Sequence, residues 1–192
     1  MNMVQSVNKI LLHACCGICS GYPITFLLEN GYEPVVYFCN PNIDTKEEFK
    51  RRLDAQRTVC EHFGVDLVVE EYNHKSYLEE IKGLESEPET GKRCDICIKM
   101  RLKKAFEKAQ ELGILQVTTS LVISPHKNFE KISKIGENLS KEYLVHNDLP
   151  LKYLPLNFRK KDGFLKTNNI SKKLNIYRQN YCGCEFAKNH IK

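Results

Sequence analysis

The 192-residue sequence predicts an α/β fold in which one parallel sheet is covered by helices on both faces. Short apolar runs alternate along the chain with longer segments whose apolar residues recur every three or four positions, the pattern of strands alternating with amphipathic helices. The composition, 42% hydrophobic and 28% charged, is typical of a globular protein with one buried core. Because ligands bind parallel sheets outside the carboxyl ends of the strands, we expect the functional site at that edge.

The first half of the chain is predicted to alternate strands and helices. Ser20 is the predicted N-cap of the first helix, and Asn30-Gly31 ends it. Asn40-Pro41-Asn42 is predicted to form a turn between a strand and a long amphipathic helix. In order, the predicted elements are strand Lys9–His13, helix Tyr22–Glu29, strand Pro34–Cys39, helix Thr45–Phe63, strand Val65–Glu70 and helix Ser76–Leu84.

The second half continues the alternation and then loses it. The predicted elements are helix Asp95–Leu112, ended by Gly113, strand Gln116–Ile123, helix Phe129–Leu144 and a short fifth strand at Leu144–His146. Residues 150–192 show little periodicity. We therefore expect a single domain, with residues 1–149 as the α/β core and residues 150–192 as a C-terminal appendage that folds back over the functional end of the sheet.

Cysteine spacing is the strongest chemical signal in the chain. Seven of the nine cysteines fall in three clusters, Cys15-Cys16-Gly17-x-Cys19, Cys94-x-x-Cys97 and Cys182-Gly183-Cys184. The first cluster follows a predicted strand, the second opens a predicted helix, and spacings of this kind suit thiolate ligation of metals or clusters. Because a tetrahedral zinc or a cubane cluster uses about four protein ligands, seven thiols leave room for a second metal centre. The predicted metal ligands are Cys15, Cys16, Cys19, Cys94, Cys97, Cys182 and Cys184.

Other uses of these thiols remain open from spacing alone. A structural zinc could hold the appendage to the sheet, and Cys-x-x-Cys at a helix start could form a redox pair. The sequence begins without a secretory signal pattern and has no run long enough to span a membrane, so a cytoplasmic protein with free thiols is expected. Cys39 and Cys60 have no cysteine neighbours in the sequence and are predicted to be buried as small hydrophobic residues.

The charge pattern points to an anionic partner. The formal net charge is +5, and basic residues gather at Arg51-Arg52, Arg101–Lys104, Arg159–Lys161, Lys172-Lys173 and Arg178. Tyr177-Arg178-Gln179-Asn180-Tyr181 combines two rings, a guanidinium and side-chain amides, the groups that read single-stranded RNA. A solvated basic surface with core tyrosines is an equal alternative on composition. Neither common phosphate-binding loop, G-x-x-x-x-G-K-[ST] or G-x-G-x-x-G, occurs.

Six motifs in order carry a resemblance to a known family. They are His13-x-Cys15-Cys16-Gly17-x-Cys19, Asn40-Pro41-Asn42-Ile43, Arg93-Cys94-x-x-Cys97 with Arg101-Leu102, Thr118-Thr119-Ser120-Leu121, Ser124-Pro125, and Tyr177-Arg178-Gln179-Asn180-Tyr181-Cys182-Gly183-Cys184. Together they resemble the cobalamin-independent epoxyqueuosine reductase family over nearly the whole chain. The resemblance implies a Rossmann-like sheet of the adenine-nucleotide α-hydrolase-like (HUP) type, closed over its metal site by the C-terminal segment. It also implies a [4Fe-4S] cluster, an additional mononuclear iron and no cobalamin.

The implied activity is the two-electron removal of the epoxide oxygen from epoxyqueuosine at the wobble position of a tRNA anticodon. The implied partners are that tRNA and a separate electron donor, because no flavin or nicotinamide motif is visible. His13, Asp95 and Tyr181 are candidate catalytic residues, since they stand beside the cysteines in sequence. Asp95 could instead ligate metal or cap a helix. The residues expected to bind substrate are Asn40, Asn42, Arg51, Arg159, Tyr177, Arg178 and Gln179.

Two other functions remain possible from the sequence. An ATP-dependent tRNA-modifying enzyme would share the fold, although the Ser-Gly-Gly-x-Asp-Ser loop of such enzymes is missing. A non-catalytic RNA-binding module stapled by zinc would explain the thiols and the basic residues without any reaction. The identity of the bound metal distinguishes that module from the reductase.

Overall fold

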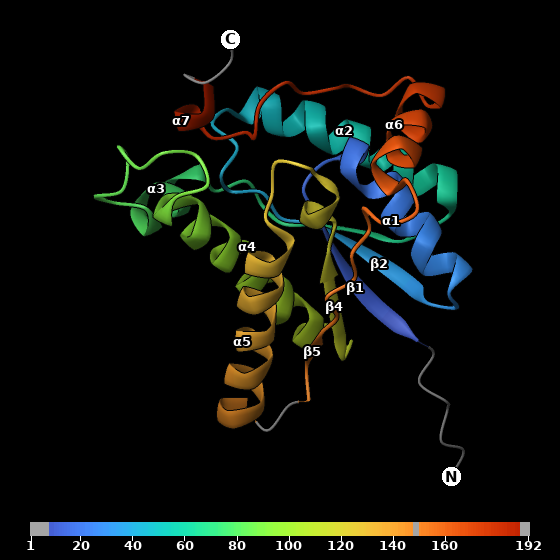
Figure 1. The fold of residues 1–192 in the computed structure, drawn as a ribbon, viewed down its shortest axis with the longest axis horizontal. Helices are drawn as coiled ribbons and strands as arrows, with labels where there is room; N and C mark the ends of the chain where they lie inside the picture. The colour runs from blue at the N-terminus through green and yellow to red at the C-terminus, as the bar shows by residue number, and fades with distance from the viewer. Residues whose placement is uncertain (1–7, 148–149, 189–192) are drawn as a thin grey trace.

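The computed structural model of the chain describes residues 8–147 and 150–188 (Figure 1). Five strands form one sheet in the order β3-β2-β1-β4-β5, and every neighbouring pair is parallel. This confirms the predicted α/β class. The strands are β1 (Lys9–Ala14), β2 (Glu33–Phe38), β3 (Leu67–Val69), β4 (Gln116–Thr119) and β5 (Lys152–Tyr153).

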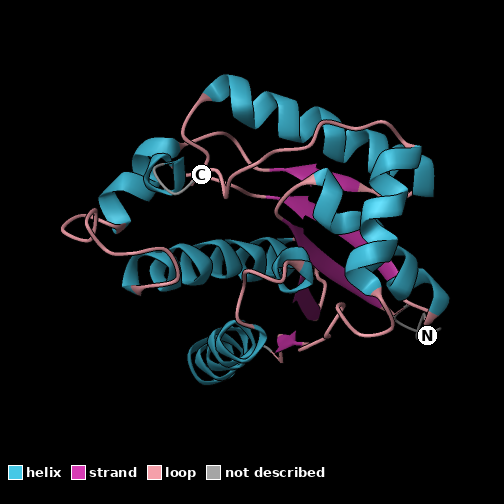
Figure 2. Cartoon of the chain, turned by 45° about the horizontal axis from the view of Figure 1, so that its top comes forward, coloured by secondary structure: helices cyan, strands magenta, loops and turns pink. Residues whose placement is uncertain are grey.

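Helices cover the sheet on both faces (Figure 2). Helices α1, α2 and α6 lie together on one face, and α4 and α5 lie on the other, with α3 beside α4 at the end of the molecule (Figure 1). The helices are α1 (Gly17–Glu29), α2 (Lys46–Phe63), α3 (His74–Glu80), α4 (Lys92–Glu111), α5 (Phe129–Asn147), α6 (Gly163–Lys173) and the single turn α7 (Glu185–Lys188), with a 3-10 turn, η1, at Ser120–Ile123.

The central strand β1 organises the core and the site. Ile10, Leu11 and Leu12 are fully buried between the helical layers, and Leu11 pairs with Val35 of β2 and Val117 of β4. The chain runs from β1 outward to β3 on one side and later from β4 outward to β5 on the other. The loops after β1 and β4 therefore diverge at the carboxyl edge, and a crevice opens there.

Three helices begin earlier than the sequence predicts: α3, which starts at His74, and two that carry cysteines. Helix α1 starts at Gly17 with Cys16 as its N-cap, so Ser20 is inside the first turn and was wrongly predicted as the cap. The Ser20 hydroxyl donates to the carbonyl of Cys16 and to Gln56 Oε1 on α2. Helix α4 starts at Lys92 after Gly91, so Asp95 lies in the first turn and does not cap the helix.

The predicted fifth strand at Leu144–His146 is wrong, because this segment continues helix α5. The fifth strand is β5, which pairs with β4 through Lys152 and Tyr153. The predicted strand over Gln116–Ile123 ends at Thr119, whose hydroxyl accepts from the backbone N–H of Leu121 and turns the chain into η1. That turn brings Ser120 next to the first cysteine cluster.

The C-terminal segment does more than cover the sheet. After supplying β5 and packing α6 against α1, the chain returns across α2 to α7 (Figure 1). We call residues 175–184 the C-terminal strap. The division into a core of residues 1–149 and an appendage of residues 150–192 stays a prediction.

Among the described residues, no helix is long and apolar enough to cross a membrane.

Gly17 fixes the distance between α1 and α2. A Cβ at this position would lie 2.7 Å from the carbonyl oxygen of Ala55 on α2 and 2.8 Å from its carbonyl carbon, and rigid backbone cannot give way. We predict that Gly17→Ala lowers the free energy of unfolding by about 1–3 kcal/mol, the usual cost of overpacking. Chemical denaturation measures it, with Glu29→Ala at the exposed end of α1 as the control. A Gly17→Ala protein as stable as the unaltered chain would contradict this close approach.

Candidate metal centre

The first cysteine cluster forms one compact group of three thiols. The sulfur atoms of Cys15, Cys16 and Cys19 all lie within 4.8 Å of one another at the carboxyl end of β1. The backbone N–H of Cys15 donates to the Ser120 hydroxyl at 3.1 Å, which ties the cluster to the turn after β4. Cys19 follows Cys16 by one helical turn and thus points to the same side. The three thiols are arranged as a metal site with three protein ligands.

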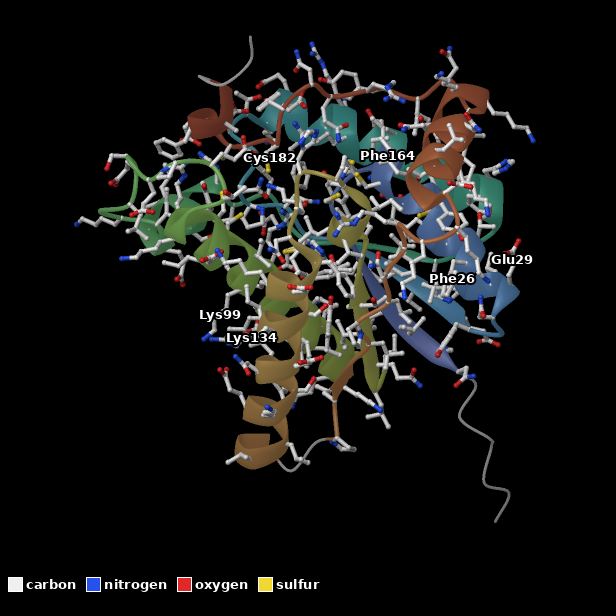
Figure 3. All side chains as sticks on the ribbon, viewed as in Figure 1. Phe26, Glu29, Lys99, Lys134, Phe164 and Cys182 are labelled. Carbon is white, nitrogen blue, oxygen red and sulfur yellow. The ribbon has the colours of Figure 1, made fainter. Side chains whose placement is uncertain are left out.

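The other four thiols gather around the start of α4. The charges of Cys182, Cys184 and Cys94 all act on Cys97, and Cys97 and Cys184 pack into one small apolar cluster with Tyr77. Figure 3 labels Cys182 where the C-terminal strap passes over this end of the sheet. The structure therefore divides the seven thiols into a group of three and a group of four. Cys39 and Cys60 are buried, 1% and 3% exposed, as the sequence predicts.

Burial makes most of these thiols poor thiolates in the absence of a cation. Burial raises the pKa of Cys97 to about 12, and it also raises that of Cys184. In the group of three, the pKa of Cys15 is well below its usual value because the thiols of Cys16 and Cys19 donate to it, and the same interactions raise the pKa values of both donors. A bound metal cation would deprotonate the whole set.

Buried cations already face the thiols. Arg101 is 3% exposed, and burial lowers its pKa, but the charges of Cys97 and Cys15 outweigh this and raise it above the usual value. The ammonium of Lys127 lies 3.4 Å from the Cys182 sulfur and 3.8 Å from Glu89 Oε1. Burial lowers the pKa of Lys127, whereas the charges of Cys182 and Cys94 raise it above its usual value. Such cations fit an anionic metal–thiolate centre.

A buried ion pair on α2 holds the C-terminal strap. Arg52 Nε lies 2.7 Å from Glu48 Oε1, and both residues are buried. The two terminal nitrogens of Arg52 donate to the backbone carbonyls of Cys182 and Tyr181 at 3.1 and 3.2 Å. The Tyr177 hydroxyl donates to the other Glu48 oxygen at 2.8 Å. The pair thus positions the last two cysteines.

A cavity of about 690 Å³ opens over both thiol groups. Cys15, Cys16 and Cys19 line it from one side, and Cys182 lines it from the other. Its remaining walls combine cations with polar groups, among them Arg52, Arg101, Lys127, Gln179, Asn180 and Tyr181. The amide nitrogen of Gln179 lies 2.7 Å from the Cys16 sulfur, so the strap contacts the first thiol group directly. A molecule in this cavity would touch cysteines of both thiol groups.

The candidate catalytic residues occupy three different settings. His13 is fully buried, and its ring nitrogens contact the Thr119 hydroxyl at 2.8 Å and the Cys39 carbonyl at 3.1 Å. Burial lowers the pKa of His13 to about 3, so the ring is neutral and links β1 to both neighbouring strands. Its contacts favour a structural role. Catalysis by His13 stays a prediction.

Tyr181 lines the cavity, whereas Asp95 does not. The Tyr181 hydroxyl donates to Asp44 at 2.9 Å, and burial together with this bond raises its pKa above its usual value. Asp95 forms an ion pair with Lys131 at 2.7 Å in a neighbouring cavity of about 730 Å³. Their catalytic roles stay predictions.

The residues expected to bind substrate divide into exposed and buried sets. Asn40 and Asn42 are only 2% and 1% exposed, so they lie beneath the cavity. Arg51 stacks on Tyr177, and Arg159 lines the neighbouring cavity. Gln179 lines the main cavity, and exposed Arg178 donates to Ser171 and Asn168 of α6. Substrate binding by these residues stays a prediction.

Some site residues were not predicted from the sequence as site residues. Glu48 and Arg52, four apart on an amphipathic helix, have the spacing of an ordinary surface ion pair. Lys127 has no motif of its own. The Arg52 position was noted only as part of a basic cluster, and its burial depends on the strap, which is distant in sequence.

Comparison with known proteins agrees with the geometry. The family model for "Epoxyqueuosine reductase QueH" matches residues 10–190. The chain belongs to the epoxyqueuosine reductase QueH family. It is 37% identical to the QueH of Streptococcus pyogenes serotype M1, over 93% of this chain and 70% of that protein. It is 31% identical to the QueH of Thermotoga maritima, over 94% of this chain and 91% of that protein. The comparisons favour neither alternative left open by the sequence.

Among solved structures, the U34-tRNA thiolase NcsA of Methanococcus maripaludis, determined with its [4Fe-4S] cluster, has a similar fold. The TM-score is 0.58 at 17% identity, and the match covers 96% of this QueH-family chain and 62% of NcsA. A likeness at this identity shows the fold, and it agrees with the predicted Rossmann-like class.

A substitution in the Glu48–Arg52 pair tests whether this pair holds the C-terminal strap. Arg52→Met leaves the Glu48 carboxylate buried without its cation, and breaking a buried pair costs about 3–5 kcal/mol. We predict that this variant is destabilised by that amount in denaturation and retains less bound metal, since Cys182 loses its anchor. Arg57→Met, on an exposed face of the same helix, is the control, with an expected change below about 1 kcal/mol. Equal stability and metal content in both variants would show that the Glu48–Arg52 pair does not hold the strap.

Proposed function

We propose that this chain is an oxidoreductase that removes the epoxide oxygen of epoxyqueuosine in a tRNA anticodon, giving queuosine and water, without cobalamin. One observation carries the proposal beyond family membership: cysteines of both thiol groups line the same cavity. A purely structural zinc site needs about four ligands and no cavity beside them.

The donor set fits the metals that the proposal requires. We assign Cys94, Cys97, Cys182 and Cys184 to a [4Fe-4S] cluster, which takes four thiolates, and Cys15, Cys16 and Cys19 to an additional iron. When bound, these groups supply electrons singly and a Lewis acid that draws charge from the epoxide oxygen. The buried Arg101 and the partly buried Lys127 would compensate the negative charge of such a centre.

The reaction consumes two electrons and two protons for each epoxide oxygen released as water. A separate electron donor supplies the electrons. Two polar residues of the chain, Lys127 and Tyr181, line the cavity where the leaving oxygen would lie. Because the Tyr181 hydroxyl already donates to Asp44, we assign the donor to the leaving oxygen to the Lys127 ammonium, which carries three protons. A cation there stabilises negative charge that develops on the oxygen.

The surface beside the cavity suits an RNA loop. Exposed Arg178 lies next to the C-terminal turn of α6, which carries Lys172 and Lys173. Asn180 and Tyr181 follow on the strap and line the cavity. A wobble nucleotide splayed from the anticodon would enter the cavity while neighbouring phosphates contact these cations.

Metal analysis and turnover test the proposal together. We predict about five irons and about four sulfides in each anaerobically purified chain, with release of queuosine-containing tRNA when a reductant is supplied. Cys97→Ser is expected to lose sulfide and cluster absorbance, whereas Cys15→Ser is expected to lose iron and activity but keep the sulfide. Cys60→Ser is the matched control. Zinc without sulfide in the unaltered chain, persisting after iron and sulfide reconstitution, would refute the reductase.

RNA binding is tested apart from chemistry. We predict that Arg178→Ala weakens binding of the tRNA and lowers the salt dependence of log K by about one unit of slope, since one phosphate contact is lost. Lys134→Ala on α5, on the other face of the sheet (Figure 3), is the control and should change neither. An unchanged affinity and slope in Arg178→Ala would remove the strap from the RNA interface.

A further inference from the structure

Arg101 is a buried cation with an unused donor. Its side chain is 3% exposed and lines the main cavity, yet its Nε has no hydrogen-bond partner. Among the described residues, no carboxylate forms a salt bridge with it. A buried guanidinium without an anion is strongly unfavourable, so the site is built for an anionic group beside Arg101.

Arg101 lies between the two thiol groups. The charges that act on it come from Cys97 of the group of four and Cys15 of the group of three, and also from Cys182. Arg101 projects from α4 one helical turn beyond Cys97, so it lies on the same face of the helix as this member of the group of four. Lys127, by comparison, is acted on by the charges of Cys182 and Cys94, both from the group of four.

The other cavity cations are already paired with carboxylates. Arg52 pairs with Glu48, and Lys127 lies 3.8 Å from Glu89. Their charges are therefore partly neutralised before any metal binds. Arg101 keeps its full positive charge for the thiol groups.

Asn40 orients Arg101. Its side-chain oxygen accepts from a terminal nitrogen of Arg101, and its amide nitrogen donates to the Ala14 carbonyl at 3.0 Å. The Ala14 carbonyl is at the end of β1, directly before Cys15. Asn40 thus connects the guanidinium to the strand that carries the first thiol group, with neutral groups only.

We propose that Arg101 sets the reduction potential of the metal centre, by its unpaired charge and a hydrogen bond from Nε, and that Asn40 is the positioning residue that holds it there. This inference rests on the proposed function. Reduction by one electron from the separate donor adds negative charge to the centre. A fixed cation nearby stabilises the reduced state more than the oxidised state and raises the potential.

The test is a redox titration of the anaerobically reconstituted chain, followed by paramagnetic resonance. Arg101→Gln removes the charge and keeps a polar side chain of similar reach, and we expect a more negative midpoint potential. The expected shift changes the ratio of reduced to oxidised centre at least tenfold at a fixed potential. Arg101→Lys, which keeps the charge, is expected to have a midpoint potential close to that of the unaltered chain. Lys103→Gln, an exposed cation two residues further along α4, is the control and should leave the potential unchanged.

Iron and sulfide content separates the possible failures. If Arg101→Gln retains full iron and sulfide with an unchanged potential, the inference is wrong while the proposed function stands. If Arg101→Gln does not assemble a centre, Asn40→Asp provides the second measurement, because its carboxylate neutralises the guanidinium in place. An unchanged potential in a loaded Asn40→Asp chain overturns the inference, and a more negative one supports it. Zinc without sulfide in the unaltered chain overturns both proposals.

Discussion

The site depends on the ion pair between Glu48 and Arg52. Three segments far apart in the sequence supply the seven clustered thiols, and the last of them, the strap, has almost no regular structure of its own. Backbone carbonyls of Tyr181 and Cys182 accept from Arg52, and Tyr177 donates to Glu48. Because these bonds are made to the backbone and to a fixed carboxylate, they position the strap regardless of what its remaining side chains contact.

Two features determine the electrostatics of the site: the thiols outnumber the cations, and the cations differ in whether a carboxylate pairs with them. Burial keeps isolated thiols protonated, so seven thiols close together become thiolates only with compensating positive charge. The proposed metals would supply most of this positive charge, and Arg101 and Lys127 supply the rest from the protein. Lys127 extends from a loop and shares its charge with Glu89, whereas Arg101 is fixed on α4 by Asn40. A cation that is shared with a carboxylate at the cavity wall suits a reacting oxygen, and a fixed, unshared one suits a permanent anionic centre.

The sequence predicts the fold class and the seven thiols because both depend on local patterns. Strand β1 is a short continuous apolar run and helix α2 has a periodic apolar face, and the sequence predicts both within one residue of their observed bounds. Helix α1 was placed too late, because its first turn is stabilised by Ser20 bonding to Gln56 on another helix. Strand β5 was missed because two residues carry no pattern, and its pairing depends on β4. The split of the thiols into three and four depends on the path of the strap, which no local pattern encodes.

Helix α2 packs against glycines from the first and the last cysteine motifs. Gly17, between Cys16 and Cys19, lets α1 approach the Ala55 carbonyl of α2, where a Cβ would clash at 2.7 Å. Gly183, between Cys182 and Cys184, has a φ of 120°, and a Cβ there would lie 3.0 Å from the Arg52 guanidinium. Two of the three cysteine motifs, the first and the last, therefore contain a glycine that packs directly against α2, so one helix positions both of these motifs. A larger residue at either glycine would move one of these motifs relative to the other, and the two proposed centres would lose their relative geometry before the sheet lost its core.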